Sequence, residues 1–281
     1  MTNRLAVHPL FFLIVFIALV YDFIYEVLLL FTVVLIHELG HALTAHFLGW
    51  RVRKIQLLPI GGVAEIDEYG TAPMKEEWMV TLAGPLTNVI MLGAGYGLLQ
   101  VGVWEEPFAY AFLNVNAVIL LFNLLPIWPL DGGRCLQLLL CLLLPYYRAV
   151  KWTLWISLFG VSLYILVVLF VMPQALYLWM ISVFLVFSIY IEFKQSSFQF
   201  LRFLMHRHYG KKDDFPLDTT SVHVSPYDTL HTALEKMFRH KSHYFFVMQA
   251  NQFVYLFSEE EMLSYYFEKQ RSHCTVQRLL R

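Results

Sequence analysis

Two histidines and a glutamate lie within a long apolar run, in the order His37-Glu38-Leu39-Gly40-His41. Residues i and i+4 of an α-helix share a face, so His37 and His41 can place two imidazole nitrogens on one metal ion. Glu38 follows the first histidine directly, where it can act as a general base on a metal-bound water, as in zinc peptidases. The spacing therefore predicts a zinc site with hydrolytic chemistry.

An alternative for these residues is a pair of helical histidines that bond to neighbouring groups, with Glu38 incidental. The apolar surroundings argue against this alternative. A charge at the centre of a membrane helix costs roughly 2.5 to 3.5 kcal/mol on insertion scales, and such groups mark functional sites by default. A bound metal ion would offset that cost.

A zinc ion held by two histidines and a water lacks one protein ligand, and Asp131 is the candidate for it. It is the only carboxylate in positions 107–191. Gly132 and Gly133 follow it and permit backbone conformations that would aim its carboxylate into a helix bundle. The alternative is a plain Asp-Gly turn at the membrane surface, and the spacing alone does not choose between the two.

The composition indicates that lipid is the main solvent of the chain. Hydrophobic residues make up 58% of the sequence and charged residues 15%, and the mean hydropathy is +0.58, outside the range of ordinary soluble domains. The formal net charge of -1 argues against direct nucleic-acid binding. The three cysteines have neither the spacing of a zinc ribbon nor an even count, so we interpret them as reduced thiols.

Six apolar segments are expected to cross the membrane, although the first is short for a span. Loops that lack Lys and Arg alternate with loops that contain them, and positive residues are retained on the cytoplasmic side. Both termini are therefore expected in the cytoplasm. The expected spans cover residues 5–20, 27–48, 78–99, 108–125, 152–171 and 175–191.

The polarity of the chain changes after Ile191. Residues 192–214 are basic and aromatic and suit an anionic membrane surface. Residues 215–281 have the pattern of a small soluble α/β domain. The pattern predicts a helix over 229–239, strands over 244–248 and 253–257, and a second helix capped by Ser258 and Glu261. The expected organisation is a six-span membrane domain (1–191), a basic linker (192–214) and a cytoplasmic domain (215–281).

Further motifs accompany the histidine pair in order along the chain, and they lie in the expected spans. They are Ala83-Gly84-Pro85-Leu86-Thr87-Asn88, and Asn123 followed by Pro129-Leu130-Asp131-Gly132. Together with His37 to His41 they resemble the site-2 protease family of intramembrane zinc metalloproteases. The resemblance covers nearly the whole chain and points to the sporulation branch of that family.

The resemblance implies a role for each matching residue. His37, His41 and Asp131 would be ligands of one zinc ion per chain, and Glu38 would be the base that activates water. Asn123, with Pro129 of the same motif, would contact the substrate backbone or the oxyanion near the zinc.

Gly61, Gly62 and Val63 belong to a segment, 57–66, that resembles a membrane-embedded β-hairpin or re-entrant loop. This segment would receive the substrate as an added strand, because a helical substrate must unwind before its peptide bond can be cut. An ordinary turn at Gly61-Gly62 is the alternative. Gly84, Pro85 and Asn88 are interpreted as positions of close helix packing.

The resulting fold class is mainly α: a polytopic membrane protein of about six transmembrane helices with a small C-terminal α/β domain. The element order of residues 215–281 resembles a single cystathionine-β-synthase (CBS) domain. Such modules pair and bind adenine nucleotides, which would imply ATP as a ligand and a homo-oligomer. A docking domain without a ligand is the alternative.

The expected function is hydrolysis of a peptide bond within or near the bilayer. The alternative is a zinc-binding membrane transporter or a non-catalytic scaffold. The resemblance implies a membrane-associated pro-sigma factor as substrate, inhibitory membrane-protein partners, and the mother-cell membrane around the forespore as the location.

Overall fold

The computed structural model describes residues 5–7, 15–16, 18–50, 52–58, 61–66, 72–210, 218–249, 252–268 and 274–279. The chain divides into two compact units, each described here by itself. The first comprises residues 1–135 and 160–185, and the second comprises residues 136–159 and 186–281.

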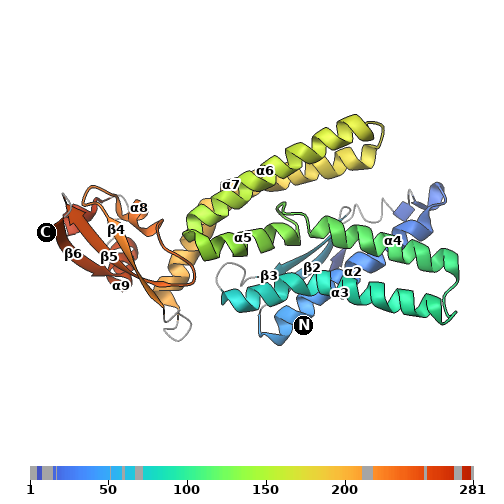
Figure 1. The fold of residues 1–281 in the computed structure, drawn as a ribbon, viewed down its shortest axis with the longest axis horizontal. Coiled ribbons are helices and arrows are strands. Elements are labelled where there is room, and N and C mark those ends of the chain that lie inside the picture. The colour runs from blue at the N-terminus through green and yellow to red at the C-terminus, as the bar shows by residue number, and fades with distance from the viewer. Residues whose placement is uncertain are drawn as a thin grey trace. The chain divides into compact units, whose positions relative to one another are not determined.

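Three neighbouring helices form the body of the first unit (Figure 1): α2 (Ile24–Phe47), α3 (Met74–Gln100) and α4 (Glu106–Asn123). Apolar side chains from all three helices meet in one buried cluster. A Cβ atom at Gly95 of α3 would lie 3.0 Å from the ring of Phe112 on α4, so the missing side chain lets these helices approach closely. The cluster consists of Leu29, Val33, Met91, Phe112 and Ile119.

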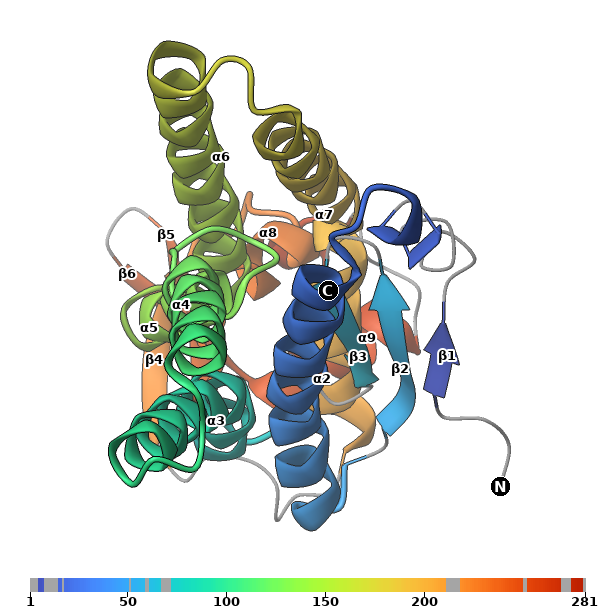
Figure 2. The ribbon, with the colours of Figure 1, turned by 90° about the vertical axis from the view of Figure 1, so that its right-hand side faces the viewer.

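A three-stranded sheet, β1 (Leu5–Val7), β2 (Val52–Leu58) and β3 (Gly61–Ile66), completes the first unit. Strand β1 pairs in parallel with β2, and β2 pairs in antiparallel fashion with β3. Both β2 and β3 lie against α2 (Figure 2). The β-hairpin expected for residues 57–66 is thus present in its strands, and its position in a membrane stays a prediction.

The first expected span, residues 5–20, is wrong at its start because Leu5–Val7 is a strand. These three residues pair with Ile55–Leu57 of β2. A short apolar run can satisfy its backbone at a sheet edge as well as in a helix, and its composition does not separate the two outcomes. Residues 8–14 and 17 of this span lie outside the described residues.

Four helices of the described chain are long and apolar enough to cross a membrane: α2, α3, α6 (Tyr146–Val171) and α7 (Leu176–Tyr209). The fourth expected span lies in α4, whose 18 residues include three asparagines, and α4 is not among the four. The total of six spans and the cytoplasmic position of both termini therefore stay predictions.

Helix α7 extends well beyond its expected span. Its 34 residues are about 51 Å long at 1.5 Å per residue, against a hydrocarbon thickness of roughly 30 Å. Residues 192–209 of the expected basic linker are helical and continue α7 without a break. The division at residue 191 thus marks a change of polarity within one helix.

The second unit contains another three-stranded sheet, of β4 (Thr219–Val224), β5 (Ser242–Gln249) and β6 (Gln252–Ser258), with α8 (Leu230–Leu234) and α9 (Glu259–Phe267). Strand β4 is parallel to β5, and β5 is antiparallel to β6. The two expected strands are confirmed, and so is the capping box between Ser258 and Glu261. The strand-helix-strand-strand-helix order is present, and its identity as a CBS domain stays a prediction.

Helix α8 ends at Leu234, five residues before the expected end of the helix at 229–239. Tertiary hydrogen bonds explain the early end. The Phe238 N–H donates to His243 Nε2 at 2.8 Å, and the Met237 carbonyl accepts from Tyr146 N–H at 2.9 Å. These backbone groups are satisfied outside a helix, so local propensity does not decide their conformation.

A buried ion-pair cluster at Glu259 joins the end of α7 to the C-terminal sheet within the second unit. Arg207 donates to both carboxylate oxygens of Glu259, at 2.6 and 2.7 Å. His243 Nδ1 also donates to Glu259, at 2.9 Å, because its Nε2 accepts from Phe238. Burial favours the neutral acid, but the hydrogen bonds from His243 and Arg207 outweigh it and lower the pKa of Glu259 below its ordinary value of 4.5.

The lowered pKa of Glu259 predicts acid sensitivity of the C-terminal domain. The stabilisation is present above pH 4.5 and is lost as the pH falls through the folded-state pKa, because the unfolded chain then binds the additional proton. Hydrogen-exchange protection factors of β5 and α9 should fall in that window. Glu259→Gln should weaken protection already at pH 7 and flatten its pH dependence, whereas Asp218→Asn, at an exposed position of the same domain, should behave as the wild type.

Candidate metal centre

Helix α2 places His37 and His41 one turn apart on one face, as the i, i+4 spacing requires. Both side chains are buried, with 2% and 5% of their surface exposed. Their Nε2 atoms lie 3.1 Å apart. The histidine pair expected from the sequence therefore points both rings toward one place inside the first unit.

Asp131 completes this group from a distant part of the chain. It is the first residue of α5 (Asp131–Leu143), and its Oδ2 atom lies 3.1 Å from His37 Nε2 and 3.2 Å from His41 Nε2. Two ligand atoms at about 2.0 to 2.1 Å from a tetrahedral zinc ion are roughly 3.3 Å apart. The three atoms thus have the mutual spacing of three zinc ligands.

The outer nitrogens of the two rings show why a cation belongs between them. His37 Nδ1 lies 2.7 Å from Asn88 Oδ1, and His41 Nδ1 lies 2.7 Å from the Val80 carbonyl oxygen. Both oxygens can only accept, so each Nδ1 carries the proton. In the neutral rings each Nε2 then presents a lone pair, and the two lone pairs meet the Asp131 carboxylate within 3.2 Å. Three electron-rich atoms at this spacing fit a bound metal ion.

Gly84 of α3 lies against the two histidine rings. A Cβ atom at this position would lie 2.2 Å from His41 Nε2 and 2.7 Å from His37 Cε1. Any side chain would therefore occupy the space of the two rings. We interpreted Gly84 from the sequence as a helix-packing position, and the structure adds that what packs against it is the histidine pair itself.

Gly132 and Gly133 are required for a different reason from the one expected from the sequence. Among the described glycines, only Gly49 and Gly102 have a positive φ, so neither Gly132 nor Gly133 uses a left-handed conformation. A Cβ at Gly132 would lie 2.3 Å from the Leu124 carbonyl oxygen. The pair thus permits α5 to start directly against the preceding loop, which brings Asp131 to the histidines.

The other expected site residues lie in the same unit. Glu38 is partly buried and interacts electrostatically with His37, His41 and Asp131. Asn123 is the last residue of α4, and Pro129 lies in the loop between α4 and α5. Gly61, Gly62 and Val63 begin strand β3, so they are strand residues, and β3 contacts α2. Their roles in catalysis and substrate binding stay predictions.

Asn88 has a role that we missed in the sequence, where it was interpreted as helix packing. It orients His37 through its Oδ1 atom, while its Nδ2 and backbone carbonyl pair with Asn116 of α4 at 3.5 and 3.2 Å. The spacing offered a signal, because Val80, Gly84 and Asn88 are each four residues apart and share one face of α3. All three contact the histidine pair.

Replacing Asn88 should weaken metal binding without unfolding the protein. Loss of such an outer partner typically costs about 10- to 100-fold in metal affinity. We expect Asn88→Ala to show this loss in competition with a zinc chelator, and Asn88→Asp, which keeps an acceptor for His37 Nδ1, to retain most of the affinity. Asn114→Ala, at an exposed position of α4, is the matched control and should bind zinc as the wild type does.

Comparison with known proteins gives consistent matches. The sequence pattern of peptidase family M50 matches residues 25–104. Stage IV sporulation protein FB of Bacillus subtilis is 35% identical over 99% of this chain and 96% of its own length. A zinc metalloprotease of Methanocaldococcus jannaschii is 31% identical over 76% of this chain and 61% of its own length. The solved structure of the site-2 protease from Methanocaldococcus jannaschii matches with a TM-score of 0.51 and 30% identity, and covers 67% of this chain and 89% of that one.

Proposed function

Because this chain belongs to peptidase family M50, the site-2 protease family of zinc metalloproteases, we propose that it hydrolyses a peptide bond of a membrane-associated protein within or near the bilayer. The observation that carries the proposal is the convergence of His37, His41 and Asp131 in a helical unit with membrane-length helices. These three residues would hold one zinc ion. When bound, zinc activates water as a nucleophile and polarises the substrate carbonyl.

Glu38 is the proposed general base. It would take a proton from the attacking water and deliver it to the leaving amine, which is the usual task of the glutamate in this motif. Its position beside both histidines and its electrostatic interaction with them support this role.

The substrate segment would bind as an extended strand. Its backbone groups must be satisfied after the substrate helix unwinds in an apolar surrounding, and pairing with a sheet edge provides partners for them. Strand β3, which contains Gly61, Gly62 and Val63, has β2 on one side and is the terminal strand of its sheet among the strands that the structure describes. Asn123 and Pro129 would contact the substrate near the metal ligands.

We propose a pro-sigma factor as the substrate, because the similarity to a sporulation protein extends over nearly the whole chain. Regulation by inhibitory membrane partners and a location in the membrane around the forespore belong to the same proposal. The test is co-expression of this chain with candidate precursors, read as a shift to a shorter product on a gel. Absence of any cleaved product with every membrane-associated precursor, from a zinc-loaded protein, would contradict the substrate class.

A zinc-binding transporter or scaffold remains the alternative function. It would use His37, His41 and Asp131 in the same way, but it would not require Glu38. The enzyme is therefore favoured by the complete motif, and the two functions make opposite predictions for a Glu38 variant.

The C-terminal domain is proposed to sense a nucleotide as a CBS-like module, with ATP as the ligand and pairing between chains. Truncation after Lys212 should leave zinc binding intact, lower the cleavage of a full-length precursor, and remove any dependence on ATP. A ligand can shift cleavage only through different affinities for two arrangements. The measurement compares full-length and truncated enzyme with and without ATP. Equal rates in all four conditions would show that the domain is dispensable, and a loss that ATP never modulates would favour simple docking.

A further inference from the structure

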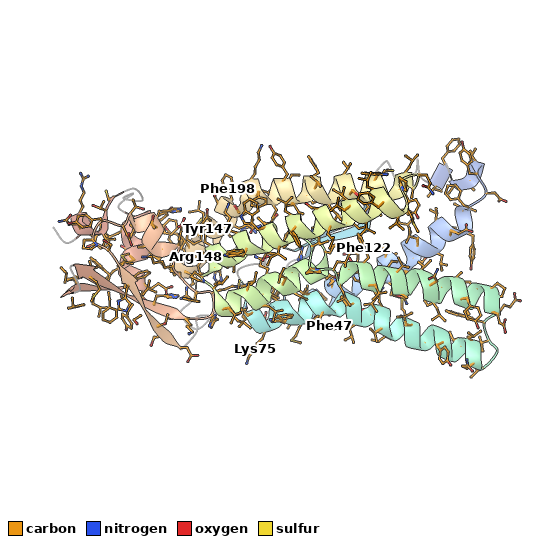
Figure 3. All side chains as sticks on the ribbon, turned by 45° about the horizontal axis from the view of Figure 1, so that its top comes forward. Phe47, Lys75, Phe122, Tyr147, Arg148 and Phe198 are labelled. Carbon is orange, nitrogen blue, oxygen red and sulfur yellow. The ribbon has the colours of Figure 1, made fainter. Side chains whose placement is uncertain are left out.

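The first turns of α6 carry a cavity that the metal centre does not use. Its volume is about 610 Å³, and it is lined by Tyr147, Arg148, Lys151, Trp152, Trp155 and Glu235. Five of these residues come from α6, and Glu235 follows directly after α8. All six belong to the second unit. Figure 3 shows Tyr147 and Arg148 side by side at this end of α6.

The cavity is lined by two cations, Arg148 and Lys151, and by one carboxylate, Glu235. Among the residues that the structure describes, no carboxylate forms an ion pair with Arg148 or Lys151. Lys151 Nζ donates instead to Ser196 Oγ at 2.9 Å and lies 5.5 Å from the ring centre of Tyr147. Glu235 Oε1 lies 3.4 Å from His231 Nε2. Two cations and one carboxylate leave one net positive charge in the cavity.

The two positive charges are electrostatically unfavourable at this end of α6 when no anion is bound. Arg148 and Lys151 lie in the first two turns of α6, where the helix dipole is positive and where acidic residues would be stabilising. They are also three residues apart, so their like charges face each other on the helix surface. A bound anion would relieve both effects, since the positive end of the helix dipole and both side chains would then face a negative charge.

The aromatic residues around the cavity suit the depth of lipid headgroups. The apolar stretch of α6 begins at Trp152, and Trp152 and Trp155 are 56% and 58% exposed. Tryptophan is enriched at membrane-water interfaces. Arg148, Trp152, Trp155 and Phe159 follow each other at intervals of four, three and four residues and share one face of the helix. Phe159 is 74% exposed, so this face continues as an open apolar surface.

We propose that this cavity binds the phosphodiester of an anionic phospholipid. Arg148 and Lys151 hold the phosphate, Trp152, Trp155 and Phe159 contact the glycerol and acyl chain, and Glu235 accepts a hydrogen bond from a hydroxyl of the headgroup. The single net positive charge matches the single negative charge of phosphatidylglycerol. A nucleoside triphosphate shares the phosphate chemistry, but it carries several negative charges and has no chain to cover the apolar face.

The test uses the full chain in a neutral detergent, with native mass spectrometry to count lipid adducts. The probes are dioctanoyl phosphatidylglycerol and dioctanoyl phosphatidylcholine. We expect a preference for phosphatidylglycerol, and Arg148→Gln with Lys151→Gln should lower its affinity by about 30-fold, at roughly tenfold or less for each cation. The matched control is Lys75→Gln with Arg278→Gln, which removes the same charge from exposed positions outside the cavity and should change the affinity less than twofold.

Equal affinities in the wild type and the Arg148/Lys151 double variant would overturn the proposal, because neither cation would then contribute to binding. An equal loss in both double variants would also overturn it, because binding would then follow general charge. Complete displacement of the lipid by an equal concentration of inorganic phosphate or ATP would overturn a lipid as the source of the phosphate. Glu235→Gln removes a negative charge and keeps both cations, so its expected effect on lipid affinity is opposite to that of the double variant. It should raise the affinity for phosphatidylglycerol several-fold, and an unchanged or lower affinity would count against the proposed geometry even if the double variant does not fold.

Discussion

Glu38→Gln should abolish cleavage while the protein keeps its zinc. Removal of a general base typically lowers the rate by 10² to 10⁴-fold, and glutamine has the same shape but cannot take up the proton. Zinc should remain because the three converging ligand atoms belong to His37, His41 and Asp131. The measurement pairs the amount of cleaved precursor with the metal content of the purified protein.

Glu26→Gln is the matched control for this experiment, because it removes an exposed carboxylate from the same helix. It should cleave and bind zinc as the wild type does. Near-normal cleavage by Glu38→Gln would exclude the proteolytic mechanism and favour the transporter or scaffold. Loss of zinc together with activity would show that Glu38 helps to hold the metal ion, which contradicts a role as the general base alone.

Gly84→Ala should destroy the metal site by adding one methyl group. The new Cβ would lie 2.2 Å from His41 Nε2 and 2.6 Å from His41 Cε1, which is closer than nonbonded atoms can approach. Either the rings turn away from Asp131 or α3 moves off α2, and both changes separate the ligand atoms. We expect zinc affinity to fall by about 100-fold or more, beyond the loss typical of an outer partner, and cleavage to fall with it.

Gly93→Ala provides the comparison on the same helix, since no atom lies within 4 Å of the added Cβ. It should keep full zinc binding and gain up to about 1 kcal/mol of stability from the better helix propensity of alanine. Thermal unfolding of the two variants separates local from global damage. Normal zinc binding by Gly84→Ala would show that the histidine rings are not held where the structure places them.

Local patterns in the sequence predicted the parts of the site that lie within one element. The His37 and His41 pair follows from helix periodicity, which is a property of a few consecutive residues. The same holds for the capping box at Ser258 and for strands β5 and β6, whose patterns and turn residues are contiguous. Family membership also followed from motifs that are each short and local.

Pairings between distant segments were not accessible in this way. Leu5–Val7 became a strand because β2 offered it an edge, and α8 ended early because His243 and Tyr146 took up backbone groups beyond it. Apolar composition predicts burial, but it does not tell which partner satisfies the backbone. The expected helices failed where a partner from far along the chain supplied the hydrogen bonds.

The sequence by itself therefore determined which residue types are available for the chemistry, and that two of them share a helix face. Only the tertiary structure decided that Asp131, 90 residues after His41, meets them within 3.2 Å. It also showed that the absence of a side chain at Gly84 leaves room for both imidazole rings, and that Asn88 orients the ring of His37. The physical reason is that helix periodicity acts over a few residues, whereas the approach of α3 and of Asp131 to α2 depends on the packing of the whole first unit.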